Sequence, residues 1–486
     1  MGNHTEAKLF INGEWKARAG APIINPADET ELGIVPFATE NDLAAAVEAA
    51  EIGFKTWSHT SPSRRSEIIR DAAARIRANI EIIARDMTLE QGKPLNEARN
   101  EVRRSCQVLE WDAEEGRRTY GRIIPAEQGL HNSVKHLPIG PVAAFTPWNY
   151  PLSSVARKVG GALAAGCSVV LKASEETPAA AVHLVNAFAE AGLPEGVLNL
   201  VFGNPSQISR FFIAHRVIRM LAFTGSVPVG KSLAAQAGEF MKPCLMELGG
   251  HSPVIVCDDV DPREAGIKSA LAKASNAGQI CTAPTRWFVA ASHFEEFADQ
   301  MATTARSVRI GNGLDPETQM GPLANARRIA AMQDLISDAV KKGADVLSGG
   351  ERAANKGYYW PLTVLANVPD DARIMYEEPF GPVALVNPVS SVAEAVSKAN
   401  SLEFGLAGYA LTHSADNIAY LTDHLEVGNF AINQFVSSLP ETPFGGMKDS
   451  GYGREGGTEG LLNYTITRSI SHKTRSIEGS RPGLSS

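Results

Sequence analysis

The stretch Met220-Leu221-Ala222-Phe223-Thr224-Gly225-Ser226-Val227-Pro228-Val229-Gly230-Lys231-Ser232 is an apolar run followed by a polar, Gly-containing turn and a helical pattern. We interpret it as one strand–turn–helix unit, with the strand over 220–223 and the helix over 229–237. Similar apolar runs stand at 142–145, 168–171, 198–202 and 253–257, with helical patterns between them. Strands and helices that alternate at this spacing predict an α/β fold with a mainly parallel, doubly wound sheet.

Other segments extend this organisation in both directions. A second α/β unit is predicted over about 251–457, with helices near 261–275, 292–307 and 323–342 and strands at 286–290, 382–387 and 428–432. Near the N-terminus, Asn41 is expected to cap a helix over 43–54. Segments 120–125 and 133–137 suggest a β-hairpin, and 461–473 suggests an exposed strand that pairs with another subunit.

Composition excludes several classes of function. The chain has 486 residues, a hydrophobic share of 44% and a net charge of −8, with Lys and Arg interspersed among Asp and Glu. These values are ordinary for a globular protein and do not favour binding to nucleic acid or to an anionic membrane. The five cysteines lack CxxC spacing, and no apolar run reaches membrane-span length. We therefore expect a cytoplasmic protein without disulfides, membrane spans or a metal-ligand cluster.

The segment Gly225–Ser232 also matches the phosphate-loop pattern G-x-x-x-x-G-K-[ST] letter for letter. It follows a strand and opens a helix, which is the context such a loop requires, so a nucleoside triphosphatase is an alternative of another class. Pro228 counts against it, because proline lacks a backbone N–H that could bind phosphate. A helix N-terminus after a strand can equally bind the diphosphate of a dinucleotide.

One cysteine stands out by its surroundings. Asn276-Ala277-Gly278-Gln279-Ile280-Cys281-Thr282 follows an Ala- and Lys-rich helical pattern and precedes a strand. A nucleophile displayed on a short connection would be built this way. A lone cysteine is more often a small buried hydrophobe, so this segment alone does not establish catalysis.

Several further motifs occur in a fixed order around this segment. They are Thr146-Pro147-Trp148-Asn149-Tyr150-Pro151, Phe223-Thr224-Gly225-Ser226, Glu247-Leu248-Gly249-Gly250, Glu377-Glu378-Pro379-Phe380-Gly381-Pro382 and Pro443-Phe444-Gly445-Gly446-Met447-Lys448. With these motifs the chain resembles the NAD(P)-dependent aldehyde dehydrogenase superfamily from about residue 8 to residue 473. The resemblance implies that Cys281 is the nucleophile, that Glu247 is the general base, and that the Asn149 amide and the Cys281 backbone N–H form the oxyanion hole.

The resemblance also implies a set of cofactor contacts. Lys172 and Glu175 match contacts to the adenosine ribose, and a carboxylate there would repel a 2′-phosphate, so NAD is favoured over NADP, which stays possible. Ala173 stands where the family usually has proline. The other matching positions are Trp148 beside the nucleotide, Ser226 at the pyrophosphate, Glu378 and Phe380 at the nicotinamide ribose, and Phe223, Gly225, Val229 and Leu248 along the same cleft.

The predicted substrate is a small aldehyde, with Tyr150 and Arg157 as the candidate binding residues. Arg157 matches an arginine that succinate-semialdehyde and 2-oxoglutarate-semialdehyde dehydrogenases use for a distal carboxylate, a group that Arg binds in bidentate fashion. Those relatives usually carry a second arginine where this chain has Ser275. A general aliphatic or aromatic aldehyde is therefore the alternative, with Arg157 as a structural salt-bridge residue.

The resemblance finally predicts three structural parts. They are an NAD-binding domain over 1–119 and 139–250, a catalytic domain over 251–457, and an oligomerisation element over 120–138 and 458–486. A homodimer or homotetramer is expected from this arrangement. The active site should lie between the first two domains.

Overall fold

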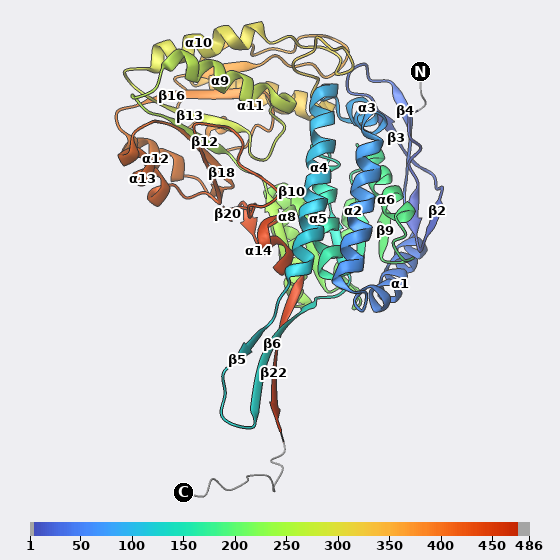
Figure 1. Ribbon diagram of the computed structural model, residues 1–486. Helices are drawn as coiled ribbons and strands as arrows, with labels where there is room; N and C mark the ends of the chain where they lie inside the picture. Colours follow the sequence, from blue (N-terminus) through green and yellow to red (C-terminus); the bar gives the residue numbers. More distant parts are fainter. Residues whose placement is uncertain (1–3, 475–486) are drawn as a thin grey trace, which may run out of the picture.

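The computed structural model describes residues 4–474 and contains two large sheets, flanking helices, a projecting β arm and two short two-stranded sheets (Figure 1). Predicted positions 1–3 and 475–486 lie outside the described residues. The doubly wound α/β architecture agrees with the fold class expected from the sequence. The alternation of buried apolar strands with helices is the physical reason, since both faces of such a sheet must be covered.

The first sheet has eight strands in the order β2-β1-β9-β8-β7-β10-β11-β21. Its central strands, from β9 to β11, are parallel and almost wholly buried, whereas the strands at both edges are antiparallel. The bounds are β1 Leu9–Ile11, β2 Glu14–Lys16, β7 Val142–Phe145, β8 Val169–Lys172, β9 Leu198–Val201, β10 Met220–Gly225, β11 Cys244–Leu248 and β21 Gly451–Tyr452.

Eight helices belong to this half of the molecule. Four of them connect its strands or lead from one strand to the next, namely α5 Ser153–Ala165, α6 Pro178–Glu190, α7 Pro205–Ala214 and α8 Val227–Glu239. The other four precede the arm, namely α1 Glu40–Trp57, α2 Pro62–Ala78, α3 Ile80–Gln91 and α4 Leu95–Glu115. Together they enclose one continuous apolar core with the strands.

The second sheet has seven strands in the order β14-β15-β16-β13-β12-β18-β19. The run at 253–257 thus begins this sheet and is not part of the first one. The strands are β12 Ser252–Val256, β13 Pro284–Ala290, β14 Asp345–Ser348, β15 Thr363–Ala366, β16 Val383–Val389, β18 Ala407–Leu411 and β19 Asn429–Ile432. The helices are α9 Pro262–Ala274, α10 Phe294–Ser307, α11 Ala326–Lys341, α12 Val392–Asn400 and α13 Ala415–His424.

The arm is a three-stranded antiparallel sheet in the order β22-β6-β5, and it extends away from the two α/β halves (Figure 1). Its strands are β5 Arg122–Ile124, β6 Leu130–Pro138 and β22 Thr465–Lys473. One edge of β22 pairs with β6 of the same chain along its whole length. The closing strand is therefore paired within its own chain, and only its other edge is free for a partner.

Short elements complete the described chain. They are β3 Gly20–Ile24, β4 Glu31–Pro36, β17 Phe404–Gly405, β20 Met447–Lys448, α14 Gly457–Leu462 and the single turns η1 Gly116–Arg118, η2 Ser275–Gly278 and η3 Arg373–Met375. Thr39 caps α1 through a reciprocal capping box with Asp42, so the prediction that Asn41 is the cap was wrong. No helix in residues 4–474 is long and apolar enough to cross a membrane.

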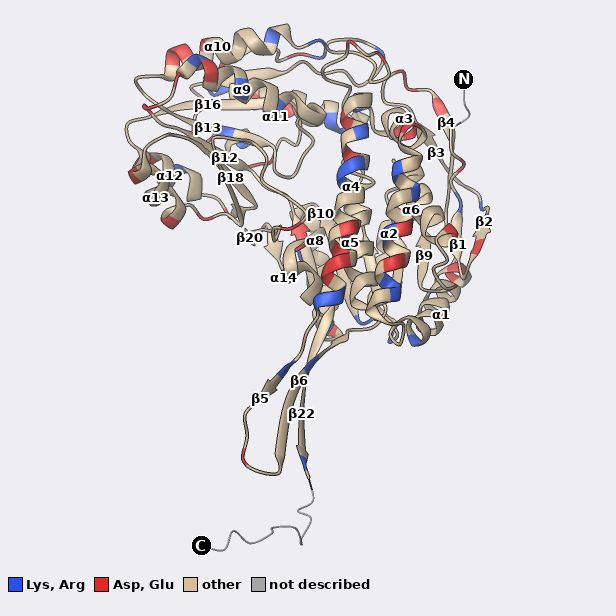
Figure 2. Cartoon of the chain, viewed as in Figure 1, with Lys and Arg blue, Asp and Glu red and all other residues tan. Residues whose placement is uncertain are grey.

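Charged residues of both signs alternate along the helices. Figure 2 shows Lys and Arg mixed with Asp and Glu on α2 and α4. Many of these side chains form short-range ion pairs across neighbouring helices, such as Arg70 with Glu114 and Arg77 with Glu110. Exposed pairs of this kind contribute little to stability.

Candidate functional site

The three candidate catalytic residues line a single cavity of about 370 Å³. Asn149 lies in the loop after β7, Glu247 lies within β11, and Cys281 lies between α9 and β13. The loops after β7 and β11 leave the carboxyl ends of parallel strands, where ligands bind in open α/β sheets. The Cys281 segment comes from the second half of the molecule. The cavity is therefore formed by both halves.

The turn before Cys281 has an unusual backbone. Asn276 and Ala277 have φ values of 47° and 50°, which are left-handed conformations that residues other than Gly rarely adopt. Gly278 follows with φ 67°, and a Cβ there would lie 2.1 Å from the Gly381 carbonyl oxygen. Such strain persists where the surroundings hold it, often at functional sites. The turn directs the chain from α9 into the cavity.

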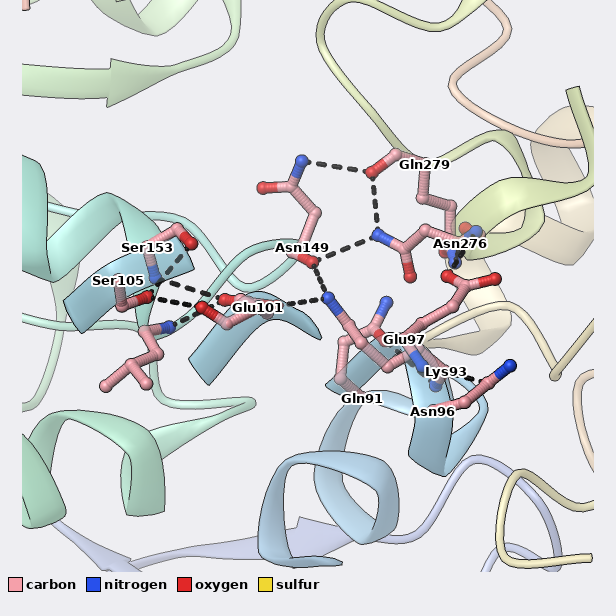
Figure 3. Close-up of polar contacts among 11 residues, drawn as sticks. Gln91, Lys93, Asn96, Glu97, Glu101, Ser105, Asn149, Ser153, Asn276 and Gln279 are labelled. Atoms are coloured by element: carbon pink, nitrogen blue, oxygen red, sulfur yellow. Dashed lines mark hydrogen bonds and ion pairs between the residues drawn. The ribbon is translucent and has the colours of Figure 1, made fainter. Parts of the chain in front are cut away.

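Hydrogen bonds fix the Asn149 loop to this turn (Figure 3). The Asn149 side-chain amide donates to the Gln279 carbonyl oxygen at 3.0 Å. The Asn149 carbonyl oxygen accepts from Asn276 Nδ2 at 3.0 Å and from Lys93 Nζ at 2.8 Å. One amide N–H of Asn149 is thus held by protein, which leaves the second N–H available to a ligand in the cavity.

A buried ion pair supports the same loop from α4. Lys93 Nζ lies 2.6 Å from Glu101 Oε2, and both side chains are about 1% exposed. The other oxygen of Glu101 accepts from the backbone N–H groups of Leu152 and Ser153 at 2.9 and 3.1 Å (Figure 3). A carboxylate at this place satisfies free N–H groups at the start of α5. Sequence reasoning missed this pair, because nothing local marks it.

The electrostatics of Cys281 and Glu247 are coupled. Burial raises the pKa of the Cys281 thiol well above its usual value, and the neighbouring Glu247 carboxylate raises it further. Burial also raises the pKa of Glu247 to about 7, with a further contribution from Glu455. Glu247 Oε1 is buried without a hydrogen-bond partner. A carboxyl group with this pKa, next to a protonated thiol, suits a general base that works near neutral pH.

A lysine behind Glu247 is the second feature that sequence reasoning missed. Lys158 is fully buried on α5, and its Nζ lies 2.5 Å from both Glu455 Oε1 and Thr224 Oγ1. Glu455 and Thr224 also line the cavity. A buried lysine is tolerated only when its charge is paired in this way. The Glu455 carboxylate adds to the rise that burial causes in the pKa of Glu247, and the Lys158 charge opposes it.

The residues predicted to contact adenosine lie at the end of β8. Lys172 Nζ is 2.8 Å from the Glu175 carboxylate, and Glu175 Oε1 accepts from the Gly203 N–H at 3.0 Å. These bonds hold the Glu175 carboxylate in place at the carboxyl edge of the sheet. A positioned carboxylate there can accept hydrogen bonds from ribose hydroxyl groups.

The predicted nicotinamide-ribose contacts lie between the two halves. Glu378 accepts a hydrogen bond from the Gly250 N–H at 3.2 Å, and burial raises its pKa to about 8. A Cβ on Gly249 would lie 2.4 Å from Glu378 Oε2, so this close approach requires glycine. The Trp148 and Phe380 rings meet edge to face at 5.5 Å. These acceptors and aromatic surfaces fit a dinucleotide.

The backbone conformation contradicts the phosphate-loop interpretation. β10 continues to Gly225 and α8 begins at Val227, so Ser226 alone connects them. Lys231 lies inside the helix and pairs with Asp449. A helix thus replaces the loop that would have to enclose a triphosphate. Of the other positions predicted along this cleft, Phe223 and Leu248 are buried in the core, whereas Val229 is 48% exposed.

The cavity also holds the predicted substrate residues, Tyr150 and Arg157. Arg157 Nη2 donates to Ser438 Oγ at 2.7 Å, and its guanidinium lies 5.3 Å from the centre of the Phe444 ring. Within residues 4–474, no carboxylate lies within ion-pairing distance of Arg157, which counts against a structural salt bridge. Ser275, which stands where relatives carry a second arginine, faces the same cavity.

Comparisons with known proteins agree with this geometry. The model of the aldehyde dehydrogenase family matches residues 15–470. A 4-(hydroxymethyl)benzenesulfonate dehydrogenase of Comamonas testosteroni is 46% identical over 95% of this chain and 97% of its own. A 3-sulfolactaldehyde dehydrogenase of Pseudomonas putida is 39% identical over 94% of this chain and 95% of its own.

A solved structure is similarly close. The succinate-semialdehyde dehydrogenase of Burkholderia pseudomallei superimposes with a TM-score of 0.94 at 37% identity, over 96% of this chain and 98% of that one. Fold, family match and relatives agree over almost the whole described chain. The chain belongs to the aldehyde dehydrogenase family and is an oxidoreductase that acts on aldehydes with NAD(P) as its cofactor.

Proposed function

We propose that this enzyme oxidises an aldehyde whose distal end carries an anionic group, that it prefers NAD to NADP, and that Cys281 forms the covalent intermediates. The observation that carries the proposal is the common cavity of Cys281, Glu247, Asn149 and Arg157. Semialdehydes with a distal carboxylate, such as succinic or 2-oxoglutaric semialdehyde, belong to this class. A neutral aliphatic or aromatic aldehyde is the alternative.

In the first half of the proposed reaction, Glu247 accepts the thiol proton and the Cys281 sulfur bonds to the aldehyde carbon. The oxygen of the resulting thiohemiacetal becomes negative. The second N–H of the Asn149 amide and the Cys281 backbone N–H are placed to donate to it. When bound, NAD would supply the acceptor for the hydride of this carbon. A thioester on Cys281 remains.

Before the second half, Glu247 releases the thiol proton to solvent; it then accepts a proton from the water molecule that attacks the thioester carbon. The carbon–sulfur bond breaks, the carboxylic acid leaves, and the Cys281 thiol regains a proton. The same carboxylate serves both halves, because a pKa near 7 lets it give up a proton as readily as it accepts one.

Two findings support an anionic substrate. Arg157 borders the cavity, and no carboxylate among the described residues lies within ion-pairing distance of it. The names of the three compared proteins refer to a benzenesulfonate, a sulfolactaldehyde and succinate semialdehyde, each of which bears an anionic group.

We also propose that the enzyme forms a homodimer or homotetramer. The free edge of β22 supports this proposal, because an unpaired strand edge can pair with a partner.

The substitution Arg157→Gln is expected to lower kcat/KM for succinic semialdehyde about 100-fold, mainly through KM, because a partly buried charge-assisted contact is lost. Butanal has the same four-carbon chain without the carboxylate, and its kcat/KM should change less than about threefold. Steady-state NADH formation measures kcat/KM for both aldehydes. The exposed Arg210→Gln provides the control. If wild-type enzyme favours butanal, the substrate is neutral and this proposal is wrong.

The substitution Glu175→Gln is expected to raise the ratio of kcat/KM for NADP to that for NAD by about 10- to 100-fold, because a carboxylate no longer repels the 2′-phosphate. NADH and NADPH formation at a fixed aldehyde concentration measure the ratio. The exposed Glu295→Gln should leave it unchanged. An unchanged ratio in Glu175→Gln would mean that another group selects the cofactor.

A further inference from the structure

A second arginine, Arg104, borders the substrate cavity. It lies on α4 one turn beyond Glu101, and Glu97 lies one turn before Glu101. Glu97 accepts the Asn276 N–H at 2.8 Å, and Glu101 holds the Asn149 loop, so both residues face the site (Figure 3). Residues three and four positions apart share one face of a helix. Arg104 therefore belongs to the face of α4 that supports the cavity.

The two arginines form a cationic region that no described carboxylate contacts directly, although the charge of Glu101 acts on Arg104 and that of Arg157 acts on the buried Asp112. Within residues 4–474, Arg104 has neither an ion-pair nor a hydrogen-bond partner, and Arg157 bonds only to the Ser438 hydroxyl. Burial lowers the pKa of Arg104, and the nearby charge of Arg157 lowers it further. Of the acids that line the cavity, Glu455 is paired with Lys158 and Glu247 is the candidate base. Two like charges held together in a partly buried pocket are unfavourable until an anion binds between them.

The remaining donors indicate the shape of that anion. Ser437 and Ser438 border the same cavity. The single hydroxyl hydrogen of Tyr409 goes to the Thr282 carbonyl oxygen at 2.7 Å, so Ser437 donates to the Tyr409 oxygen. Ser438, in contrast, accepts from Arg157. The Ser438 hydroxyl therefore still has its own hydrogen to donate. A carboxylate has two oxygens in a plane, and one arginine satisfies it in bidentate fashion. Donors from α4, α5 and the 437–438 loop outnumber those two oxygens, whereas a sulfonate presents three oxygens in a tetrahedral arrangement.

The walls of the cavity suit an arene. Tyr150, Phe435 and Phe444 line it, and Phe435 packs against Tyr409 with ring centres 5.3 Å apart. Flat aromatic side chains favour a flat aromatic ligand through offset or edge-to-face contacts. A ring between the nucleophile and the arginines would also hold the anionic group at a fixed distance from the aldehyde.

From these observations we infer that Arg104 is the second anion-binding residue of the substrate pocket, and that with Arg157 it selects an aromatic aldehyde bearing a sulfonate group. The inference rests on the proposed function and specifies its substrate class. Arg104 supplies from α4 the positive charge that is absent at Ser275. It binds the distal end of the substrate and takes no part in the transfer of the proton or the hydride.

The test compares three aldehydes built on one ring, namely 4-formylbenzenesulfonate, 4-formylbenzoate and benzaldehyde, with wild type, Arg104→Gln, Arg157→Gln and Arg103→Gln. Arg103 is the matched control, because it is the exposed neighbour that bonds to Asn100 on another face of α4. NADH formation gives kcat and KM for each combination of enzyme and aldehyde. The neutral substrate reports whether each variant is folded and competent in catalysis.

Wild type should favour the sulfonate over the carboxylate about tenfold and over benzaldehyde about 100-fold. Arg104→Gln should lower kcat/KM for the sulfonate about 10- to 100-fold through KM, and the value for benzaldehyde less than threefold. Arg103→Gln should resemble wild type with all three aldehydes. The addition of benzenesulfonate should inhibit benzaldehyde oxidation competitively in wild type and much less in Arg104→Gln.

Three results would overturn the inference, and they separate it from the proposed function. If wild type favours benzaldehyde, the proposed function itself fails. If Arg157→Gln loses the preference for anions but Arg104→Gln keeps it, the proposed function stands and the role of Arg104 is wrong. If wild type favours the carboxylate over the sulfonate, Arg104 does not select a sulfonate.

Discussion

The Cys281→Ala variant is expected to lose aldehyde oxidation by at least about 10⁴-fold in kcat, because Cys281 is the only thiol among the described residues that line the cavity. The side chain is small and half-buried, so alanine should fold normally. Steady-state NADH formation with a saturating aldehyde measures the loss. A pre-steady-state burst of NADH, expected in wild type if thioester hydrolysis is slow, should be absent from the variant.

The remaining cysteines provide the control for this experiment. Cys244 is also half-buried and lies on β11, three positions before Glu247, but it does not border the cavity. Cys244→Ala should therefore keep nearly full activity and its burst. NADH formation by Cys281→Ala at more than about 1% of the wild-type rate would show that the sulfur is not the nucleophile.

The common cavity of Cys281, Glu247 and Asn149 could be predicted because each residue lies in a short motif with a fixed position relative to the others. Asn149 and Glu247 come after or at the ends of parallel strands, so the strand–helix alternation already placed them at one edge of a sheet. The structure adds how deeply these side chains are buried. Glu247 is 3% exposed between β10 and β21, whereas its sequence alone was equally compatible with a solvated strand end.

The residues that sequence reasoning missed share a different property. Arg104, Lys158 and Glu101 lie on helices whose charged residues look like any solvated helix face in sequence, and Lys93 lies in the short connection before α4. They are distinguished only by what packs against them, which tertiary structure decides. Lys158 is the extreme case, because its partner Glu455 lies 297 positions further along the chain. No local pattern could connect the two.

Position 275, where this chain has serine in place of arginine, also shows that a local motif does not reveal tertiary contacts. From the motif alone, a missing anchor indicated a shorter substrate, a neutral one, or one held by another group. The cavity shows that a charge can be supplied from α4, an element that carries none of the family motifs. Substrate pockets are assembled from several elements, so the loss of a residue at one position does not establish the loss of a charge.

The second large effect is expected for Glu247→Gln, which should lower kcat about 10²- to 10⁴-fold, because glutamine cannot accept the proton of the thiol or of the attacking water. The wild-type rate should also depend on pH. Burial raises the pKa of Glu247 to about 7, so the carboxylate is deprotonated and active above pH 7 and is protonated progressively as the pH falls. The wild-type rate should therefore rise through pH 7 and level off above it.

The shape of the pH profile distinguishes a base from a merely structural carboxylate. In Glu247→Gln the rise near pH 7 should disappear, whereas Glu247→Asp, which keeps a shorter carboxylate, should retain a rise with a lower maximum. Rapid mixing with NAD and aldehyde separates the two steps, since impaired hydrolysis alone would leave a full burst of NADH before a slow steady state. A Glu247→Gln enzyme that kept both its rate and its pH profile would exclude Glu247 as the base and leave Glu455, the other carboxylate that lines the cavity, to be examined.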